Sequence, residues 1–210
     1  IEKLKLARSS EYGPAFLRPK NAQYSMNVKD KRPPLSAGVK VAIQKVCKNM
    51  LRPSLSNNGI QGLKMLANKI PHWREELNGT ITNPYDGKEA HLAPLMFELT
   101  NGYIEEWGTG GSCFRKLYLS FLKELQDHPE MRSDPRPWSK QDFEILENVI
   151  PLFEDVVDDW RRFAGTLKQT SDDHGEECLS HVELDILKQI VENIMVTEEQ
   201  AFKMLSKIKN

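Results

Sequence analysis

The sequence predicts a mainly α-helical fold: a bundle-like domain of six to seven helices around one long, kinked central helix, with a single N-terminal β-strand. Three observations support this prediction. From residue 34 onward, apolar side chains recur with the 3.6-residue period of amphipathic helices. Only one short stretch alternates with the period of two that is typical of strands. The stretch 140–167 carries two apolar stripes, so it must be covered on two sides.

The predicted strand is AQYSMNV at residues 22–28, in which every second residue is polar. An isolated strand leaves the hydrogen-bonding groups of both edges unpaired. We therefore expect residues 1–33 to form a linker and a strand that pairs with an absent N-terminal domain, and residues 34–210 to form the helical domain. The chain begins with Ile1 instead of Met, which fits a piece of a longer protein.

Two helices are predicted in the first part of the helical domain. The first ends at Pro53, and its apolar stripe comprises Val39, Ile43, Val46, Cys47, Met50 and Leu51. The second is kinked or ended by Pro71, and its stripe comprises Ile60, Leu63, Ala67, Ile70 and Trp73. The segment 78–89, NGTITNPYDGKE, is rich in turn-forming residues and predicts an exposed loop between two helical halves.

Two further helices flank a cluster of glycines in the stretch GTGGSCFRKLYLSFLKEL at residues 108–125. The helix before the cluster starts at Pro94 and ends at Gly108; its stripe comprises Met96, Leu99, Tyr103 and Trp107. The helix after the cluster is expected to face the core with Phe114, Leu117, Tyr118, Phe121, Leu122 and Leu125.

The longest helix is predicted to begin at a capping box, in which Asp142 follows Ser139 by three residues. Pro151 lies within it and is expected to kink it. One of its stripes comprises Phe143, Leu146, Ile150, Phe153, Val157, Trp160, Ala164 and Leu167, and the other Ile145, Val149, Leu152, Val156 and Phe163. After a loop at 170–177, one more helix precedes a last short helix capped by Thr197 with Gln200.

Composition excludes several classes of partner. The 29 basic and 30 acidic side chains give a net charge of −1, without a block of five or more like charges, so we expect no nucleic-acid partner and no anionic-membrane partner. No run of 18 apolar residues suggests a membrane span. Three cysteines are too few and too odd in number for a disulfide framework, which favours a reducing, cytoplasmic location.

The glycine cluster allows two interpretations. It is neither a P-loop nor a Rossmann turn, because no Gly-Lys-Ser/Thr follows it and no strand leads into it. A helix amino end with open backbone nearby can bind a phosphate, and Arg115 would add positive charge. Alternatively, the glycines only turn the chain sharply between two packed helices.

Three other groups of residues have the chemistry of a site and also a plainer interpretation. Cys113, near a helix amino end, is either a nucleophile or a small buried residue. The set His174, Cys178 and His181 is either a metal site or part of a solvated loop and helix start. The carboxylates on the longest helix either serve acid–base or metal chemistry or form its solvated face; they are Glu154, Asp155, Asp158 and Asp159.

Four segments together resemble a known family: AIQKVCKNMLRP, GIQGLKMLANKIPHW, GGSCFRKLYLSFLKEL and FEDVVDDWRRFAGTL. They are similar to the C-terminal helical domain, a domain of unknown function, of the butirosin biosynthesis protein H-like family. The resemblance covers nearly the whole chain, including PKNAQYSMNV before the first helix.

The resemblance implies a role in acyl transfer. In that family a papain-like N-terminal domain precedes the helical domain, and the class of activity is acyl transfer from a carrier-protein thioester to an aminoglycoside amine. The expected partners are thus that N-terminal domain and an acyl carrier protein. No cofactor is expected on this chain itself, apart from the phosphopantetheine arm of the carrier. The residues expected to bind substrate are Gly110, Gly111, Phe114, Arg115 and Tyr118.

Overall fold

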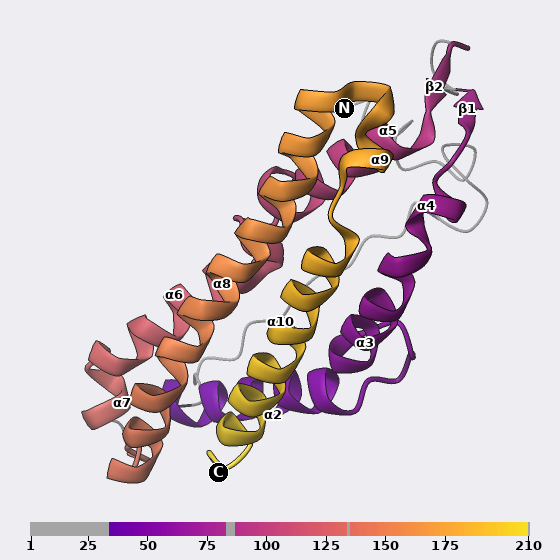
Figure 1. Ribbon diagram of the computed structural model, residues 1–210. Helices are drawn as coiled ribbons and strands as arrows, with labels where there is room; N and C mark the ends of the chain where they lie inside the picture. Colours follow the sequence, from indigo (N-terminus) through magenta and orange to yellow (C-terminus); the bar gives the residue numbers. More distant parts are fainter. Residues whose placement is uncertain (1–33, 83–86, 134, 210) are drawn as a thin grey trace, which may run out of the picture. The chain divides into compact units, whose positions relative to one another are not determined.

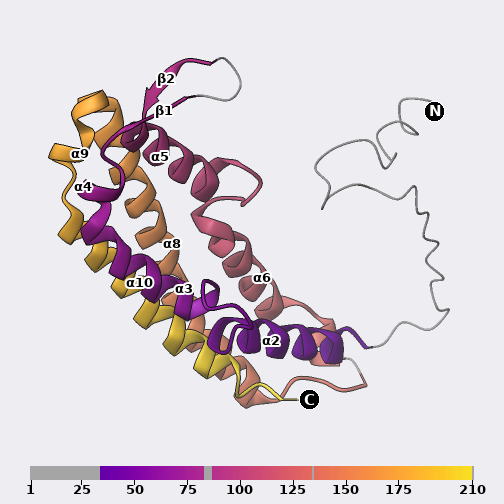
Figure 2. The same cartoon turned by 90° about the vertical axis from the view of Figure 1, so that its right-hand side faces the viewer.

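A central helix and its neighbours organise the fold. The computed structural model describes residues 34–82, 87–133 and 135–209. The predicted strand at 22–28 lies outside these residues. The central helix is α8, Lys140–His174, and it packs against α5 (Leu92–Asn101), α6 (Arg115–Asp127) and α10 (Leu184–Leu205). Figure 2 shows α8 between α10 on one side and α5 with α6 on the other. The mainly helical prediction is therefore confirmed.

The remaining helices extend this arrangement. Helix α2, Leu35–Leu51, crosses the bundle near the end of α10, and α3, Gly59–Lys69, packs along α10 (Figure 1). Short turns connect these elements: the 3₁₀ turn η1 (Ile70–His72), α4 (Trp73–Glu76), α7 (Glu130–Ser133), the 3₁₀ turn η4 (Gly175–Glu177) and α9 (Cys178–His181). Residues Pro33–Asn210 form one compact unit.

The start of α8 confirms the predicted capping box. The Asp142 backbone N–H donates to Ser139 Oγ at 3.2 Å, and the Ser139 N–H donates to Asp142 Oδ2 at 2.9 Å. Lys40 Nζ of α2 also donates to Asp142 Oδ2 at 2.8 Å, which joins α2 to the beginning of α8. The helix continues through Pro151, which has no N–H and leaves the carbonyl of Glu147 without its intrahelical partner.

The core consists of two clusters of buried side chains, and α8 and α10 contribute to both. The first cluster lies among α2, α6, the first half of α8 and the last turns of α10, and includes Ile43, Leu122, Met131, Leu146, Phe153 and Leu205. The second lies among α3, α5, the second half of α8 and the first half of α10, and includes Ile70, Phe97, Phe163, Leu167, Leu187 and Ile194.

Segment 78–89 is not a plain loop, because strands begin and end it. Strand β1, Thr80–Thr82, pairs antiparallel with β2, Glu89–His91, with Thr80 opposite His91. The strands are only three residues long and almost entirely exposed, and each contains a single apolar residue, so the alternation is too short to predict a half-buried strand.

Two helix predictions are corrected at their ends. The α-helix predicted to run to Gly108 ends at Asn101, where α5 ends. The π-helical turn η2, Gly102–Glu106, follows it directly. The predicted break at Thr197 does not occur, because α10 is continuous from Leu184 to Leu205. Side chains from both α8 and α3 cover α10, so burial outweighs the local capping signal.

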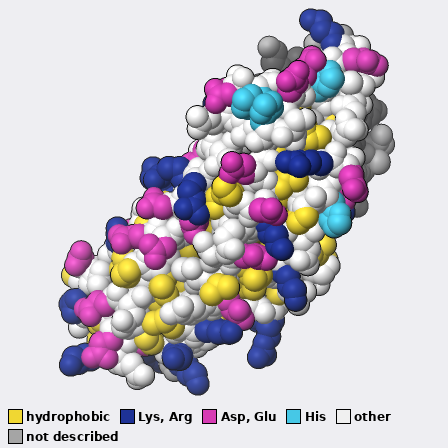
Figure 3. Space-filling view, in the orientation of Figure 1, with side chains coloured by type: hydrophobic (Ala, Val, Ile, Leu, Met, Phe, Trp, Pro, Cys, Tyr) yellow, Lys and Arg dark blue, Asp and Glu magenta, His cyan; other side chains and the backbone are white. Residues whose placement is uncertain are grey.

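Two features of the described residues bear on membranes and on charged partners. Among the described residues, no helix combines the length and the apolar composition needed to cross a membrane. Figure 3 shows Lys and Arg side chains interspersed with Asp and Glu over one face.

Candidate functional site

The glycine cluster forms a corner between η2 and α6 with an unusual backbone. Five consecutive residues have positive φ: Gly110 at 69°, Gly111 at 90°, Ser112 at 50°, Cys113 at 51° and Phe114 at 68°. The last three form the short turn η3, Ser112–Phe114. A left-handed conformation costs a non-glycine residue about 1–2 kcal/mol. Contacts around the corner must therefore hold this turn in place.

Side chains near in sequence supply several of those contacts. The Ser112 N–H donates to Glu105 Oε1 at 3.2 Å, and the Ser112 hydroxyl donates to the Val157 carbonyl of α8 at 3.0 Å. The Gly111 N–H donates to Thr109 Oγ1 at 3.3 Å. The carboxylate of Glu105 thus already lies against the backbone N–H of Ser112, where an external anion would bind. This arrangement favours the glycines as a tight turn over the glycines as a phosphate cradle.

Gly110 has a further steric reason to be glycine. A Cβ atom built at this position would lie 2.7 Å from Cγ of Leu117, on the first turns of α6. Because its φ of 69° is also left-handed, any other residue would be both strained and crowded.

Arg115 fastens the corner to α10. Its Nε donates to Glu198 Oε1 at 2.6 Å, its Nη2 donates to Glu198 Oε2 at 3.0 Å, and its Nη1 donates to the carbonyl of Cys113 at 2.7 Å. Glu198 is fully buried, with 0% of its side chain exposed, whereas Arg115 is 19% exposed. Burial opposes the charge of Arg115, but the adjacent Glu198 carboxylate outweighs it and raises the arginine pKa. The two charges therefore neutralise each other inside the fold.

A cavity of about 680 Å³ opens beside this ion pair. We call it the α2–α3 cavity, because the loop between these helices forms its rim. Leu63, Leu66 and Trp160 form apolar wall, while Cys113 and Arg115 reach it from the corner. The guanidinium of Arg115 lies over the Trp160 ring, 5.7 Å from its centroid.

The five residues predicted to bind substrate are not all at this cavity. Arg115 lines it, whereas Phe114 is 55% exposed and the Gly110–Gly111 pair forms the turn behind it. Tyr118 instead packs against the core, with its ring 5.1 Å from that of Phe153. The role of this set in substrate binding stays a prediction.

The stripe predicted for α6 is wrong in its first turn. Phe114 and Leu117 are exposed, while Leu119, Leu122 and Leu125 are the buried residues. The left-handed turn rotates the start of the helix relative to the position that a continuous helical pattern would give it.

Cys113 has the position of a site residue but not the electrostatics of a nucleophile. Burial raises the pKa of its thiol; Arg115 opposes this shift, and Glu198 and Glu105 add to it. A raised pKa keeps the sulfur protonated at neutral pH, whereas nucleophilic cysteines have depressed pKa values. The structure therefore favours Cys113 as part of the cavity wall.

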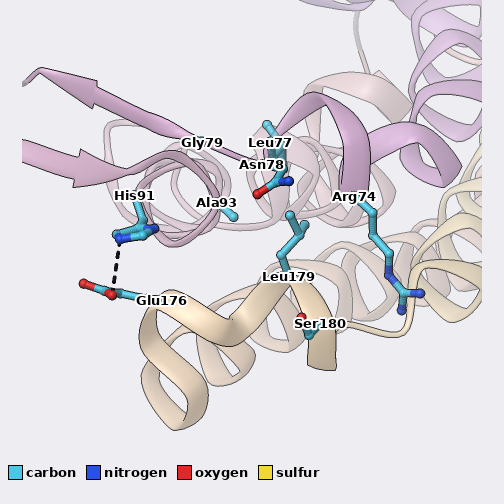
Figure 4. A pocket seen from close by; sticks show the side chains of 9 residues that line it. All are labelled: Arg74, Leu77, Asn78, Gly79, His91, Ala93, Glu176, Leu179 and Ser180. Atoms are coloured by element: carbon cyan, nitrogen blue, oxygen red, sulfur yellow. Dashed lines mark ion pairs between the residues drawn. The ribbon is translucent and has the colours of Figure 1, made fainter.

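A second, smaller pocket of about 330 Å³ lies between the hairpin, α4 and α9. Figure 4 shows His91 and Glu176 paired across one side of it, with His91 Nε2 3.2 Å from Glu176 Oε2. Arg74 stands on the other side, and its Nη2 donates to the Val182 carbonyl at 3.3 Å. Three of the polar side chains that line this pocket, His91, Glu176 and Arg74, therefore already have partners.

The other groups singled out in the sequence do not converge on a site in the described residues. His174 and His181 stack with ring centroids 3.8 Å apart, but Cys178 is buried. Within 34–82, 87–133 and 135–209, no group of three or more His, Cys, Asp or Glu side chains is placed to hold a metal ion. On α8, Glu154 pairs with Lys123 and Asp158 with Arg161, as expected of a solvated face.

Sequence reasoning missed two residues of the corner. Glu198 lies 83 positions from Arg115, and only the packing of α10 brings the two together. The sequence predicts Trp160 to be a core residue, and it is buried, but it also lines the cavity.

Comparison with known families identifies the domain. The family model described as Domain of unknown function (DUF4872) matches residues 2–205. The chain belongs to this family. The match covers nearly the whole chain, so the family relationship includes the corner and the α2–α3 cavity. Neither a curated protein nor a solved structure matches the chain.

Proposed function

We propose that this DUF4872 domain is the substrate-positioning part of an acyltransferase-like protein of small-molecule, aminoglycoside-type biosynthesis. In this proposal, a papain-like N-terminal domain supplies the catalytic groups, and an acyl carrier protein delivers the acyl group as a thioester through its phosphopantetheine arm. The amine nitrogen of the acceptor forms the new C–N bond with the acyl carbon, the C–S bond breaks, and the carrier thiol leaves with a proton. The cytoplasm is the compartment in which these partners would meet.

The observation that carries the proposal is the α2–α3 cavity beside a strained corner. The left-handed turn is held by the Arg115–Glu198 pair, and backbone held in costly conformations is typical of functional sites. The cavity is large enough for part of a substrate and joins apolar wall to polar groups, as binding sites generally do. The raised pKa of Cys113 supports a positioning role and not a nucleophilic one.

An acyl-transfer assay with the intact protein tests this function. A carrier protein loaded with an acyl thioester is mixed with an aminoglycoside, and the amide product is measured by mass spectrometry. The unloaded carrier is the control for binding without chemistry. Amide formation that requires the intact protein supports the proposal, whereas an intact protein that neither binds the loaded carrier nor forms amide contradicts it.

A second function is favoured by exposed aromatic side chains near the corner. Tyr103 and Trp107 are 64% and 51% exposed and contact each other with ring centroids 4.9 Å apart, and Phe114 and Leu117 are exposed as well. Large exposed apolar side chains are a feature of protein interfaces. We propose as the alternative that this is a non-catalytic helical module, which binds a partner or stabilises the papain-like domain.

Charge substitutions in the intact protein separate this alternative from the first function. Leu117→Glu is expected to lower the melting temperature of the papain-like half if the exposed side chains bind that half. Ile186→Glu, at an exposed apolar position on α10, is the matched control. Equal effects of the two substitutions argue against the stabilising module.

A further inference from the structure

The charge at the α2–α3 cavity is already balanced. Among the described residues that line it, Arg115 is the one cationic residue and none is acidic. Both oxygens of Glu198 accept hydrogen bonds from the Arg115 guanidinium, so its charge is matched from behind. A phosphate dianion entering here would meet a neutral pair, with the Glu105 carboxylate also holding the corner. This arrangement disfavours an anionic ligand.

Arg115 nevertheless has N–H groups that donate to none of the described residues. A guanidinium has five N–H groups. Two of them bind Glu198 and one binds the Cys113 carbonyl, which leaves one N–H on each terminal nitrogen. The side chain is 19% exposed and lines the cavity. These two groups are suited to an uncharged acceptor such as a carbonyl oxygen.

Trp160 gives an independent indication of a missing acceptor. Its side chain is 5% exposed and forms part of the cavity wall. Its Nε1 is buried and has no hydrogen-bond partner among the described residues. Buried donors are nearly always paired, so an unpaired one calls for a ligand or a water. Because the Nε1 atom itself is covered, a carbonyl oxygen bound in the cavity would reach this N–H only after the side chains around it move.

The start of α3 adds backbone donors at the rim. Asn58 occupies the N-cap position but makes no side-chain hydrogen bond to the helix. The first N–H groups of a helix have no intrahelical partners. Side chains at Gly59 and Gly62 would collide with the carbonyls of Met50 and Asn57, so the backbone itself forms the wall here. Amide side chains complete the rim: Asn49, Asn57 and Asn58.

From these groups we infer that the α2–α3 cavity binds an uncharged chain that carries amide carbonyls. Arg115, Trp160 and the α3 amino end donate hydrogen bonds to its oxygens, and Leu63 and Leu66 contact its methylene groups. The inference rests on the proposed function in one respect: the amide-bearing arm of a carrier protein is then the chain that occupies the cavity. The class of ligand itself follows from the donors, the apolar wall and the balanced charge.

Cys113 is a built-in reporter for this cavity, because Cys47 and Cys178 are buried elsewhere. The intact protein is alkylated with iodoacetamide, and the modification of Cys113 is followed by peptide mass spectrometry. The probes are N-pentylpantothenamide, which is uncharged and has two amides, and inorganic phosphate at equal ionic strength. With the amide probe at about ten times its Kd, alkylation is expected to slow about tenfold, because most cavities are then filled. Phosphate is expected to leave the rate unchanged.

Substitutions locate the effect in the cavity. Leu66→Phe narrows it, and Met65→Phe is the matched control at an exposed neighbouring position. Trp160→Phe keeps an aromatic ring but removes the unpaired N–H. We expect Leu66→Phe to abolish protection of Cys113, Met65→Phe to preserve it, and Trp160→Phe to weaken the Kd of the amide probe about tenfold, the upper range for one hydrogen bond.

Each outcome decides the inference. Protection by the amide probe that is lost in Leu66→Phe and kept in Met65→Phe supports it. Equal protection by phosphate, no protection by the amide probe, or the same loss in Met65→Phe overturns it. The acyl-transfer assay keeps the two proposals apart. Transfer without protection of Cys113 overturns this inference alone, and protection without transfer overturns the proposed function alone.

Discussion

Removing Arg115 tests whether the corner depends on its buried ion pair. Arg115→Ala leaves Glu198, whose side chain is 0% exposed, without the two hydrogen bonds that it accepts at 2.6 and 3.0 Å. Breaking a buried pair by removing one partner costs about 3–5 kcal/mol, because the remaining charge is buried and uncompensated. The carbonyl of Cys113 also loses its donor. The decrease in the free energy of unfolding should therefore lie in the upper part of this range.

Two further variants turn this expectation into a measurement of the pair. In Arg115→Met with Glu198→Met, both charges are replaced by apolar side chains, and most of the lost stability should return. Arg161→Ala is the control, since Arg161 and Asp158 form an exposed pair that contributes less than about 1 kcal/mol. Urea unfolding of the intact protein, followed by circular dichroism, gives the three free energies.

Two results would refute the reasoning. If Arg115→Ala costs no more than Arg161→Ala, the pair does not hold the corner. If the double variant is as unstable as Arg115→Ala, the buried charge is not what makes the single substitution costly.

Three further predictions address the capping box, the turn and the cavity thiol. Burial opposes the charge of Asp142, but Lys40 and Ser139 outweigh it and lower the pKa; Asp142→Asn should therefore cost about 1–2 kcal/mol at neutral pH. The difference in stability between the unsubstituted protein and Asp142→Asn should disappear as acid protonates Asp142, beginning near its unfolded pKa of about 4. If the two proteins still differ in melting temperature in strong acid, this prediction is wrong. Because the φ of Phe114 is 68°, Phe114→Gly should leave the stability of the protein unchanged or raise it by up to about 1 kcal/mol, while Phe114→Val should lower it by a similar amount. A higher urea midpoint for Phe114→Val than for Phe114→Gly would show that the backbone at this position is not strained. Iodoacetamide should modify Cys113 before Cys47, because burial raises the pKa of Cys47 to about 11. The modification of Cys113 should become faster as the pH rises. If peptide mass spectrometry shows that Cys113 reacts faster than free cysteine at neutral pH, Cys113 is again a candidate nucleophile.

Much of the fold could be predicted because its signals are local. Ser139 and Asp142 form the expected capping box, and both stripes of α8 contribute buried residues to both core clusters. The stripe predicted for residues 94–107 fails at its C-terminal end for an identifiable reason. The exposed Tyr103 and Trp107 lie in and just after the π-helical turn η2, where an extra residue per turn changes which side chains face inward. The buried residues are instead Ala93, Phe97, Asn101 and Ile104.

The site was less predictable because its contacts are not local. The glycines at 110 and 111 indicated a sharp turn, and the turn is present. No periodic pattern could indicate that Glu198 neutralises Arg115 or that Trp160 borders a cavity, because each comes from a different helix. The three non-glycine residues with left-handed backbone also carry no sequence signature, since tertiary contacts impose that conformation.

The sharing of α8 and α10 between both core clusters makes the described fold hard to open in parts. Local unfolding of either half would expose apolar side chains of α8 and α10, the two helices that also pack in the other half. Amide protons in the two halves should then exchange with solvent through one common event, with similar protection. A ligand in the α2–α3 cavity would slow that event across the whole helical array and not only at the loop that it touches.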